Sequence, residues 1–352
     1  MNIKELLQNT IDAGASDLHL VSGIFPTLRI EGELISLTSS GVLTPEMIGE
    51  FLKAILTAEQ LERLKVNKEI DFSLSFSEKA RFRVNAYTQK GSLAAAFRRI
   101  PLEIPGVDSL ELPKIIHSFT TLRQGFVLVT GPTGHGKSTT LAAILNEINQ
   151  TRSCHIVSIE DPVEFIFKPV KSIISQREMQ SDTHSWSVAL RSVLREDPDV
   201  VLVGEMRDYE TIAAALTVAE TGHLVFATLH TNSAAQTIDR IVDVFPEEQQ
   251  KQVQLQLSNV IEAVFSQRLI PGVSKKRVVA HEVMLATTAI RTAIREGKTH
   301  QIDSILQTSQ EAGMNTIEKS LAALVREGKI TLETAQSWSL RPEELTRLVR
   351  SV

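Results

Sequence analysis

The chain contains a single cysteine, Cys154, among its 352 residues. An internal disulfide cannot form, and a zinc site built from several cysteines is excluded. Long apolar runs are also missing, since none approaches the ~18 residues that a membrane-spanning helix needs. The first residues are acidic or carry amides where a signal peptide has an apolar stretch. We therefore expect no zinc, no transmembrane segment and a cytoplasmic protein.

A strong excess of one charge is absent as well. The sequence has 37 basic and 42 acidic residues, which gives a net charge of −5. This balance argues against a nucleic-acid-binding protein. Hydrophobic residues make up 42% and charged residues 22%, which is typical of globular and not of disordered chains. The length suffices for two ordinary domains, each with its own core.

The order of hydrophobic patterns predicts a mixed α+β unit in residues 1–99. It is expected to contain an amphipathic opening helix, helical segments around 45–65, and strands near 69–76, 80–89 and 92–99. Residues 100–113 contain Pro101, Pro105 and Pro113 and lack clear periodicity. We interpret them as a linker between domains.

The pattern changes after the linker. In residues 114–285, short buried strands alternate with helices, which predicts a parallel sheet in an α/β domain. The expected strands are 126–129, 156–159, 200–203 and 224–229. Residues 286–352 are predicted to be helical. The chain as a whole is thus expected to be α/β, with three parts.

A phosphate-binding loop is indicated by Gly131-Pro-Thr-Gly-His-Gly-Lys-Ser138, which fits G-x-x-x-x-G-K-[ST] and lies between a predicted strand and a predicted helix. Its glycines let successive N–H groups face a phosphate, and the helix N-terminus adds its positive end. Lys137 would reach the β- and γ-phosphates and Ser138 would bind Mg²⁺. The predicted ligands are ATP and Mg²⁺. The predicted nucleotide-binding residues are Gly131, Thr133, Gly134, His135, Gly136, Lys137, Ser138 and Thr139.

Two groups of carboxylates follow predicted strands. Glu205 ends the buried run that begins at Asp199, and in a parallel sheet it would emerge near the bound Mg²⁺, as a ligand either directly or through a water. Many phosphate-loop enzymes have aspartate at this place. The segment Ile159–Glu164 contains three acids around Pro162. Glu164 is therefore a candidate for the base that activates the attacking water.

Two histidines bracket the strand predicted at 224–229. His230 follows its nucleotide-side end and is a candidate sensor of the γ-phosphate, whereas His223 precedes it. A structural role for either histidine is an open alternative. Asp17 and His19 share one face of an early strand, and we interpret them as structural.

Two pairs of arginines are predicted to lie close together. A two-residue turn at Lys90-Gly91 would set Arg83 opposite Arg98 on neighbouring strands, where like charges repel. The spacing of Arg191 and Arg195 would place both on one helix face. Such pairs suggest an anion between them, and arginine suits a transferring phosphoryl group. The alternative is solvated surface arginine.

Together these motifs resemble the secretion ATPase superfamily, the hexameric motors of pili and secretion systems. The matching segments are Gly131–Ser138 (Walker A), Ile159–Phe165 (Asp box), Asp197–Asp208 (Walker B) and Glu220–Asn232 (His box). The resemblance implies that Glu164 is catalytic. It also implies phosphate-facing roles for Arg83, Arg98, Arg191 and Arg195. The implied fold is a PAS-like N-terminal domain and a RecA-like ATPase domain, assembled as a homo-hexamer.

Two features resemble one branch of that superfamily. The chain lacks the longer N-terminal region and the four-cysteine zinc site of assembly and type II secretion ATPases. The segment Ala289–Glu296 is similar to the A-I-R-N-L-I-R-E signature of pilus-retraction motors and departs from it at Thr292 and Ala293. We interpret this segment as a force-transmission element, with ordinary packing of an amphipathic helix as the alternative.

The branch implies an ATP-hydrolysing motor for type IV pilus retraction and twitching motility. It would act peripherally at the cytoplasmic face of the inner membrane, in contact with the inner-membrane pilus platform protein. The alternatives are an accessory retraction ATPase of the same superfamily and a nucleotide-regulated adaptor that does not hydrolyse ATP. A DNA-translocating ring is a third reading, which the acidic balance does not favour.

Overall fold

The computed structural model describes residues 2–30, 32–76, 80–100, 103–274 and 276–350. Contacts divide the chain into two units. Unit 1 comprises Met1–Glu103 and Pro162–Ile166, and unit 2 comprises Ile104–Asp161 and Phe167–Val352. The domain boundaries drawn from the sequence stay predictions. Residues 101 and 102 of the predicted linker lie outside the described residues.

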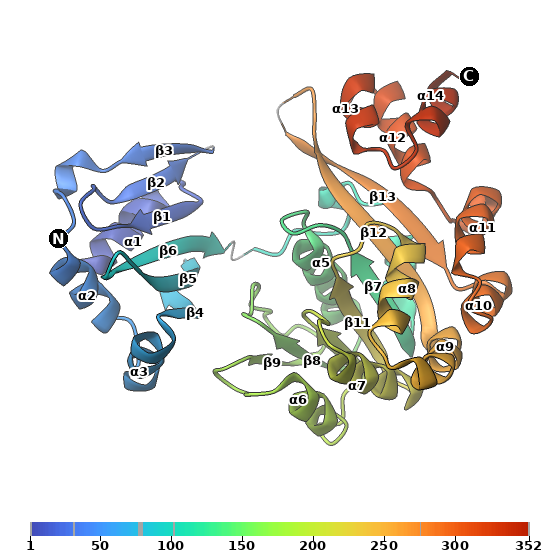
Figure 1. Ribbon diagram of the computed structural model, residues 1–352, viewed down its shortest axis with the longest axis horizontal. Coiled ribbons are helices and arrows are strands. Elements are labelled where there is room, and N and C mark those ends of the chain that lie inside the picture. The colour runs from blue at the N-terminus through green and yellow to red at the C-terminus, as the bar shows by residue number, and fades with distance from the viewer. Residues whose placement is uncertain (1, 31, 77–79, 101–102, 275, 351–352) are drawn as a thin grey trace. The chain divides into compact units, whose positions relative to one another are not determined.

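Unit 1 contains a six-stranded antiparallel sheet, whose strands follow one another in Figure 1 in the order β3-β2-β1-β6-β5-β4. The strands are β1 (Asp17–Leu20), β2 (Thr27–Ile30), β3 (Glu33–Ser36), β4 (Glu69–Phe76), β5 (Ala80–Gln89) and β6 (Ser92–Ile100). The helices are α1 (Ile3–Asp12), α2 (Pro45–Lys53), α3 (Ala58–Asn67) and the 3₁₀ turn η1 (Thr38–Ser40). The three strands expected between residues 69 and 99 are present.

One face of this sheet carries the core of unit 1. Residues of β5 alternate between buried and partly exposed, because successive side chains of a strand point to opposite faces. Phe82 and Val84 are buried and belong to one hydrophobic cluster with Leu6 of α1 and Ile48 of α2. Arg83, between them in sequence, therefore lies on the opposite face.

Unit 2 is built on a seven-stranded sheet in the order β13-β12-β7-β11-β10-β8-β9. All neighbouring strands are parallel except β12 and β13, which form an antiparallel pair. The strands are β7 (Gly125–Thr130), β8 (His155–Glu160), β9 (Ile173–Glu178), β10 (Val200–Val203), β11 (Leu224–Leu229), β12 (Ile261–Pro271) and β13 (Arg277–Leu285). β7, β8, β10 and β11 are the strands that the sequence predicted.

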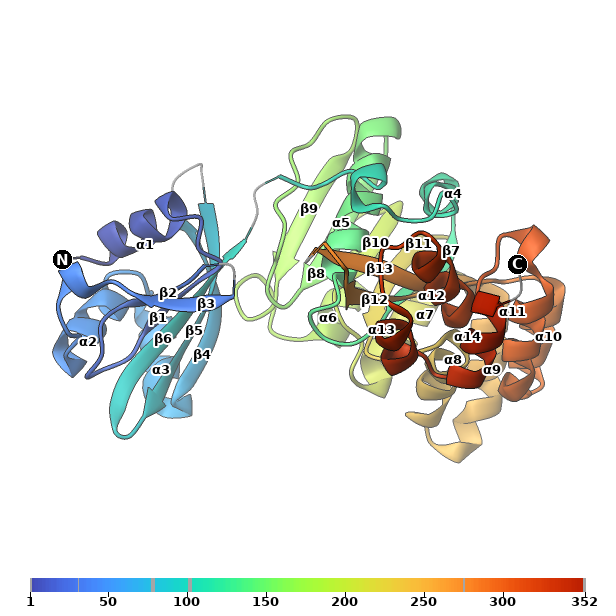
Figure 2. The ribbon, with the colours of Figure 1, turned by 90° about the horizontal axis from the view of Figure 1, so that it is seen from above.

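Helices cover both faces of this sheet, and Figure 2 shows α5 on the side opposite to α6, α7 and α8. Residues of α6 to α11 share one large hydrophobic cluster with the central strands, whereas α5 packs on β7 from the other face. The helices between β6 and β12 are α4 (Ile116–Thr121), α5 (Lys137–Thr151), α6 (Trp186–Val193), α7 (Tyr209–Glu220), α8 (Ala234–Asp243) and α9 (Glu247–Val260). The 3₁₀ turn η2 (Asp108–Leu110) precedes them.

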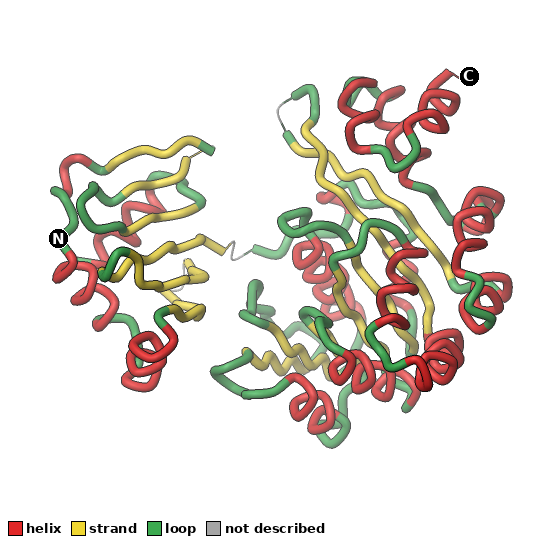
Figure 3. Tube along the Cα trace, in the orientation of Figure 1, coloured by secondary structure: helices red, strands yellow, loops and turns green. Residues whose placement is uncertain are grey.

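The C-terminal part of unit 2 is helical, as the sequence predicts, and Figure 3 shows its succession of short helices. Its elements are α10 (Thr288–Arg295), η3 (Thr299–Gln301), α11 (Ile302–Thr308), η4 (Gln310–Ala312), α12 (Ile317–Arg326), α13 (Leu332–Trp338) and α14 (Pro342–Arg350). The last three helices pack on β12 and β13 through a separate small cluster. No described helix is both long and apolar enough to cross a membrane.

Candidate nucleotide-binding site

The phosphate loop, the Walker B acid and the histidine motif meet at one edge of the sheet of unit 2. β7, β11, β10 and β8 are neighbours and run parallel, so their carboxyl ends lie side by side. Gly131 follows β7 and His230 follows β11 directly, while Glu205 comes two residues after β10. Residues from distant parts of the sequence therefore reach the same place.

The loop between β7 and α5 has a backbone that only glycine adopts easily. Gly131 has φ of 142°, and a Cβ there would lie 2.2 Å from the carbonyl oxygen of Gln267. Gly136, with φ of 83°, is the N-cap of α5 and offers no capping side chain. The first N–H groups of α5 thus receive no side-chain cap from it, which suits an incoming anion.

Lys137 is buried at the start of α5 and binds the loop that it follows. Its Nζ donates to the carbonyl oxygens of Gly131 at 2.8 Å and Pro132 at 3.0 Å. It also lies 3.3 Å from Nδ1 of His230. The ammonium is therefore held over the loop, where carbonyl oxygens and one imidazole share it.

His230 bridges Lys137 and Glu205. Its Nε2 lies 3.1 Å from Oε1 of Glu205. An ammonium only donates and a carboxylate only accepts, so the tautomer that fits both contacts carries its proton on Nε2 and accepts at Nδ1. The hydroxyl of Thr133, 3.2 Å from Nδ1, is then a second donor. The contacts place His230 where it would respond to a change at either neighbour.

Arg207 is a residue of the site that the sequence analysis did not single out. Its Nε and Nη2 donate to the two carboxylate oxygens of Glu205 at 2.8 and 2.9 Å. Burial raises the pKa of Glu205, but Arg207 and His230 outweigh it, so this pKa lies below its ordinary value. The signal was the Glu-Met-Arg run directly after a buried strand.

Gln267 and Thr140 brace the phosphate loop from inside unit 2. Gln267 is 2% exposed, and its Nε2 donates to the carbonyl oxygen of His135 at 2.6 Å. Its Oε1 accepts from the Thr140 hydroxyl at 2.7 Å. Sequence reasoning missed Gln267 because it missed the strand, β12, that carries it.

Unit 1 contains three further predicted residues. Arg83 and Arg98 are cross-strand partners, as the turn at Lys90-Gly91 predicts. Nε of Arg98 donates to Oδ1 of Asp17 at 2.9 Å, so the acid that we interpreted as structural is the partner of this arginine. Nη1 of Arg83 lies 4.0 Å from Oε1 of Glu164, whose segment is grouped with unit 1.

The helical argument for Arg191 and Arg195 is wrong. α6 ends at Val193, and Arg195 lies in the following turn, where its N–H donates to Ser192. Pro198 cannot continue a helix, and Asp197 before it has φ of 53°, so the chain turns at this point. The two arginines do not share a helix face.

The chemistry of the side chains at the site indicates which metal ion they could bind. No cluster of three or more metal-ligating side chains occurs in the described ranges of the chain. Ser138 in the first turn of α5 and Glu205 offer a hydroxyl and a carboxylate, the oxygen ligands that Mg²⁺ prefers. The donor types therefore fit Mg²⁺.

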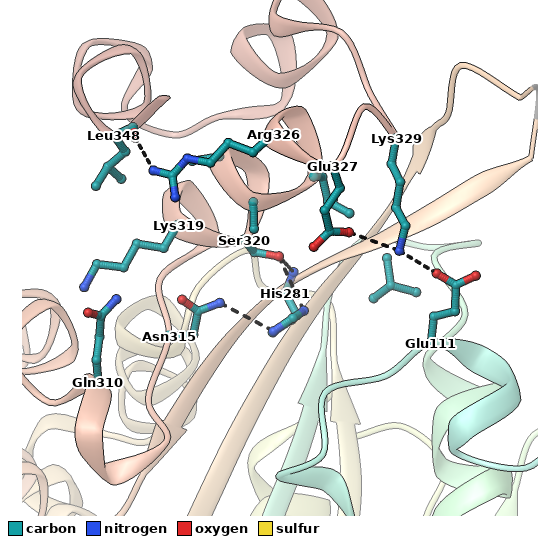
Figure 4. Close-up of a pocket in the computed structure, with 14 residues that line it drawn as sticks. Glu111, His281, Gln310, Asn315, Lys319, Ser320, Arg326, Glu327, Lys329 and Leu348 are labelled. Carbon is teal, nitrogen blue, oxygen red and sulfur yellow. Dashed lines mark hydrogen bonds and ion pairs between the residues drawn. The ribbon is translucent and has the colours of Figure 1, made fainter. Parts of the chain in front are cut away.

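A cavity of about 460 Å³ lies elsewhere in unit 2, between β13 and the C-terminal helices (Figure 4). Burial lowers the pKa of His281 in its wall to about 4, so this imidazole is neutral. Lys329 is paired with Glu111 at 2.8 Å and with Glu327 at 3.2 Å. The described residues that line it do not include the phosphate loop, so the cavity is separate from the predicted nucleotide site.

Comparison with known proteins identifies the family. Residues 2–277 match the family described as "Type II/IV secretion system protein". The chain belongs to this family. It is 46% identical over 343 residues to the type IV pilus retractation ATPase PilT of Pseudomonas aeruginosa, covering 97% of this chain and 99% of that protein. The type IV pilus ATPase PilU of the same organism is 36% identical over 353 residues, covering 99% and 92%.

A solved structure extends the likeness to three dimensions. The crystal structure of the pilus retraction motor PilT with bound ADP matches with a TM-score of 0.92 and 46% identity, covering 99% of each chain. The predicted fold class is thereby confirmed, with a PAS-like N-terminal part and a RecA-like ATPase part. The chain is an ATPase of the secretion family, as its motifs predict.

Proposed function

We propose that this ATPase is the hexameric motor that powers type IV pilus retraction, and with it twitching motility. Two relatives of nearly full length support the proposal: the PilT relative, at 46% identity, and a twitching motility protein of Neisseria gonorrhoeae, also 46% identical, over 91% of this chain. The observation that carries the chemistry is the contact of Lys137 with His230 and of His230 with Glu205, which joins three motifs.

In this proposal the nucleotide binds at residues 131–139. Its phosphates take the place of the loop carbonyls at Lys137 and accept hydrogen bonds from the backbone N–H groups at the start of α5. Ser138 and Glu205 would hold Mg²⁺, directly or through a water, and there it would neutralise charge on the phosphates. His230 moves with the γ-phosphate because it contacts both Lys137 and Glu205.

Hydrolysis requires a base and a set of cations. Glu164 accepts a proton from the water whose oxygen attacks the γ-phosphorus, and ADP leaves. Arg83, 4.0 Å from Glu164, and Arg98 supply positive charge to the transferring phosphoryl group. The corresponding role of Arg191 and Arg195 rests on the family resemblance alone.

The assembly is proposed from the same resemblance. Six copies form a ring at the cytoplasmic face of the inner membrane, where the ring contacts the pilus platform protein peripherally. A conformational change that follows nucleotide binding would couple hydrolysis to movement.

Deleting the gene and counting surface pili tests the direction of force. Loss of a retraction motor leaves excess pili and no twitching, whereas loss of an assembly motor leaves no pili. Unchanged pili and motility would instead favour an accessory retraction ATPase. Complementation with Glu164→Gln should fail, while Glu247→Gln, an exposed acid in the first turn of α9, should restore retraction.

Steady turnover by the purified protein separates the motor from a nucleotide-regulated adaptor. We expect Glu164→Gln to bind ATP and to hydrolyse it ~10²–10⁴-fold more slowly. A wild-type protein that binds ATP without turnover would contradict the motor.

A further inference from the structure

His135, in the middle of the phosphate loop, is held on three sides. Its carbonyl oxygen accepts from Gln267, and its Nδ1 accepts from the N–H of Leu269 at 3.0 Å. Its ring faces that of Trp338, with ring centres 5.5 Å apart and planes inclined by 56°. The two hydrogen bonds come from β12, whereas the ring contact comes from the end of α13.

The imidazole of His135 is neutral. Burial, followed by nearby lysine and arginine charges, lowers its pKa. A backbone N–H can only donate, so Nδ1 is the acceptor and the ring proton is on Nε2. A neutral ring packs against indole without loss of charge solvation. The contact with Trp338 is therefore apolar packing.

Trp338 has a second connection to the site, through its backbone. Arg268 is buried, with 7% of the residue exposed, and its Nη1 donates to the carbonyl oxygen of Trp338. Its Nη2 donates to the carbonyl oxygen of Asn232 at 3.3 Å. Asn232 lies two residues after His230, in the loop between β11 and α8. Arg268 therefore joins the end of α13 to this loop.

Trp338 is also fixed to the C-terminal helices. It packs against the small cluster in which Ile270 of β12, Leu321 of α12 and Leu345 of α14 are buried. A displacement of His135 would therefore push on these helices through one side chain, and a displacement of the helices would reach the loop by the same route.

We propose that Trp338 is a positioning residue of the nucleotide site. It holds His135, and with it the loop backbone, in the conformation that binds phosphate, and it passes changes at the loop to α12, α13 and α14. The proposal deepens the proposed function, since it rests on nucleotide binding at residues 131–139. It assigns to the C-terminal helices an indirect part in binding the nucleotide, through His135.

Intrinsic fluorescence tests the contact. The chain has two tryptophans, so Trp186→Phe leaves Trp338 as the sole reporter. Addition of Mg-ADP should change its emission along the binding curve that calorimetry gives for the same variant. Full binding without a change in emission would overturn the proposal. Lys137→Ala on this background should show neither signal, and if it binds normally, the phosphate-loop assignment itself fails.

Kinetics test the positioning. An aromatic contact of this kind predicts a KM for ATP that is ~2–10-fold higher in Trp338→Ala, with kcat within about twofold of wild type. Trp338→Phe, which keeps a ring, should recover most of the affinity. An unchanged KM, or a loss confined to kcat, would refute the positioning role.

A double-mutant cycle distinguishes a specific contact between His135 and Trp338 from a general loss of stability in the variants. If the rings act together, the losses of ADP affinity in His135→Ala and Trp338→Ala should not add in the double variant. Additive losses would show that Trp338 acts through general packing, and would overturn the proposal even where every variant folds.

Discussion

In unit 2 three of the predicted site residues contact one another, whereas in unit 1 two predicted arginines lie side by side on one face of a sheet. Lys137, His230 and Glu205 form a continuous chain of contacts at the ends of parallel strands. Arg83 and Arg98 are instead aligned by strand register, and their nearest carboxylates are Glu164 and Asp17. Unit 2 thus holds three of its groups by mutual contact, and unit 1 aligns its two arginines by strand pairing.

The difference suggests a division of work. Groups that must bind the nucleotide in every state benefit from a rigid, partly buried frame. Groups that act only at the transition state need a fixed orientation, with polar atoms left accessible to the substrate. The guanidinium of Arg98 fits this description, because its side chain is 72% exposed while its Nε is anchored to Asp17.

The largest effect is expected at Lys137. Lys137→Ala removes the cation that holds the phosphates, and calorimetry should detect no ATP or ADP binding. Lys114→Ala, at an exposed position, is the matched control and should bind as wild type. Normal affinity in Lys137→Ala would remove unit 2 from the comparison as the nucleotide-binding unit.

At Glu205 we expect loss of turnover with binding retained. Glu205→Gln keeps the shape of the side chain but loses the charge that Mg²⁺ and Arg207 require. Removing one such electrostatic group costs roughly 10²–10³-fold in kcat. Steady-state assays and ADP titrations on one preparation measure both quantities. Near-normal turnover would mean that another carboxylate serves the ion.

Arg98 tests the opposite half of the comparison. Arg98→Ala should lower kcat while leaving the Kd for ADP unchanged. Arg98 is exposed but Asp17 is buried, so removing the arginine leaves that carboxylate with the Ser16 hydroxyl as its donor, and the free energy of unfolding should fall by ~1–3 kcal/mol. Weakened ADP binding in this variant would contradict the division between the two units.

α10 offers a matched pair for stability. Arg291 donates to the carbonyl oxygens of Ser258, Asn259 and Ala286 and pairs with Glu262 at 2.8 Å. Arg291→Ala should lower the free energy of unfolding by ~1–3 kcal/mol, since three carbonyl oxygens and the partly buried Glu262 lose this donor. Arg295→Ala should cost under ~0.5 kcal/mol. The contacts of Arg291 favour the packing interpretation of the segment Ala289–Glu296 over force transmission, as far as this residue is concerned. If Arg295→Ala abolishes pilus retraction in cells while the rate of ATP hydrolysis stays normal, Arg295 would be the residue of this segment that transmits force.

The last prediction concerns Glu282, a buried acid of β13. It accepts from the N–H of Ala234 at 2.7 Å, and burial raises its pKa from 4.5 to about 7. Since the folded pKa exceeds the unfolded value, its contribution to stability is complete below about pH 4.5 and is lost as the pH rises through 7. The slope is at most ~1.4 kcal/mol per pH unit.

Denaturant unfolding of wild type and Glu282→Gln between pH 4.5 and 8 measures this contribution. The difference in stability between the two proteins should change with pH in favour of the variant at high pH. A difference that stays constant would mean that folding does not raise the pKa of Glu282.

The sequence predicted the strand ends of unit 2 well, because each combines a short apolar run with a polar residue of distinctive chemistry. It also predicted the pairing of Arg83 with Arg98, since a two-residue turn determines register. It missed β12, because Ile261 follows the end of α9 without a turn residue. With β12 it missed Gln267. It missed Arg207 because adjacent opposite charges are common at any surface.

The contacts between Lys137 and His230, His135 and Gln267, and Arg268 and Trp338 span 93, 132 and 70 residues of sequence. Such contacts form late, because long chain segments must close before the contacts stabilise anything. During synthesis, the phosphate loop leaves the ribosome long before the strand that braces it. We infer that a nascent chain that ends before β12 has a loop sequence complete in composition but not yet shaped to hold ATP. Nucleotide binding would thus begin only after β12 has been made.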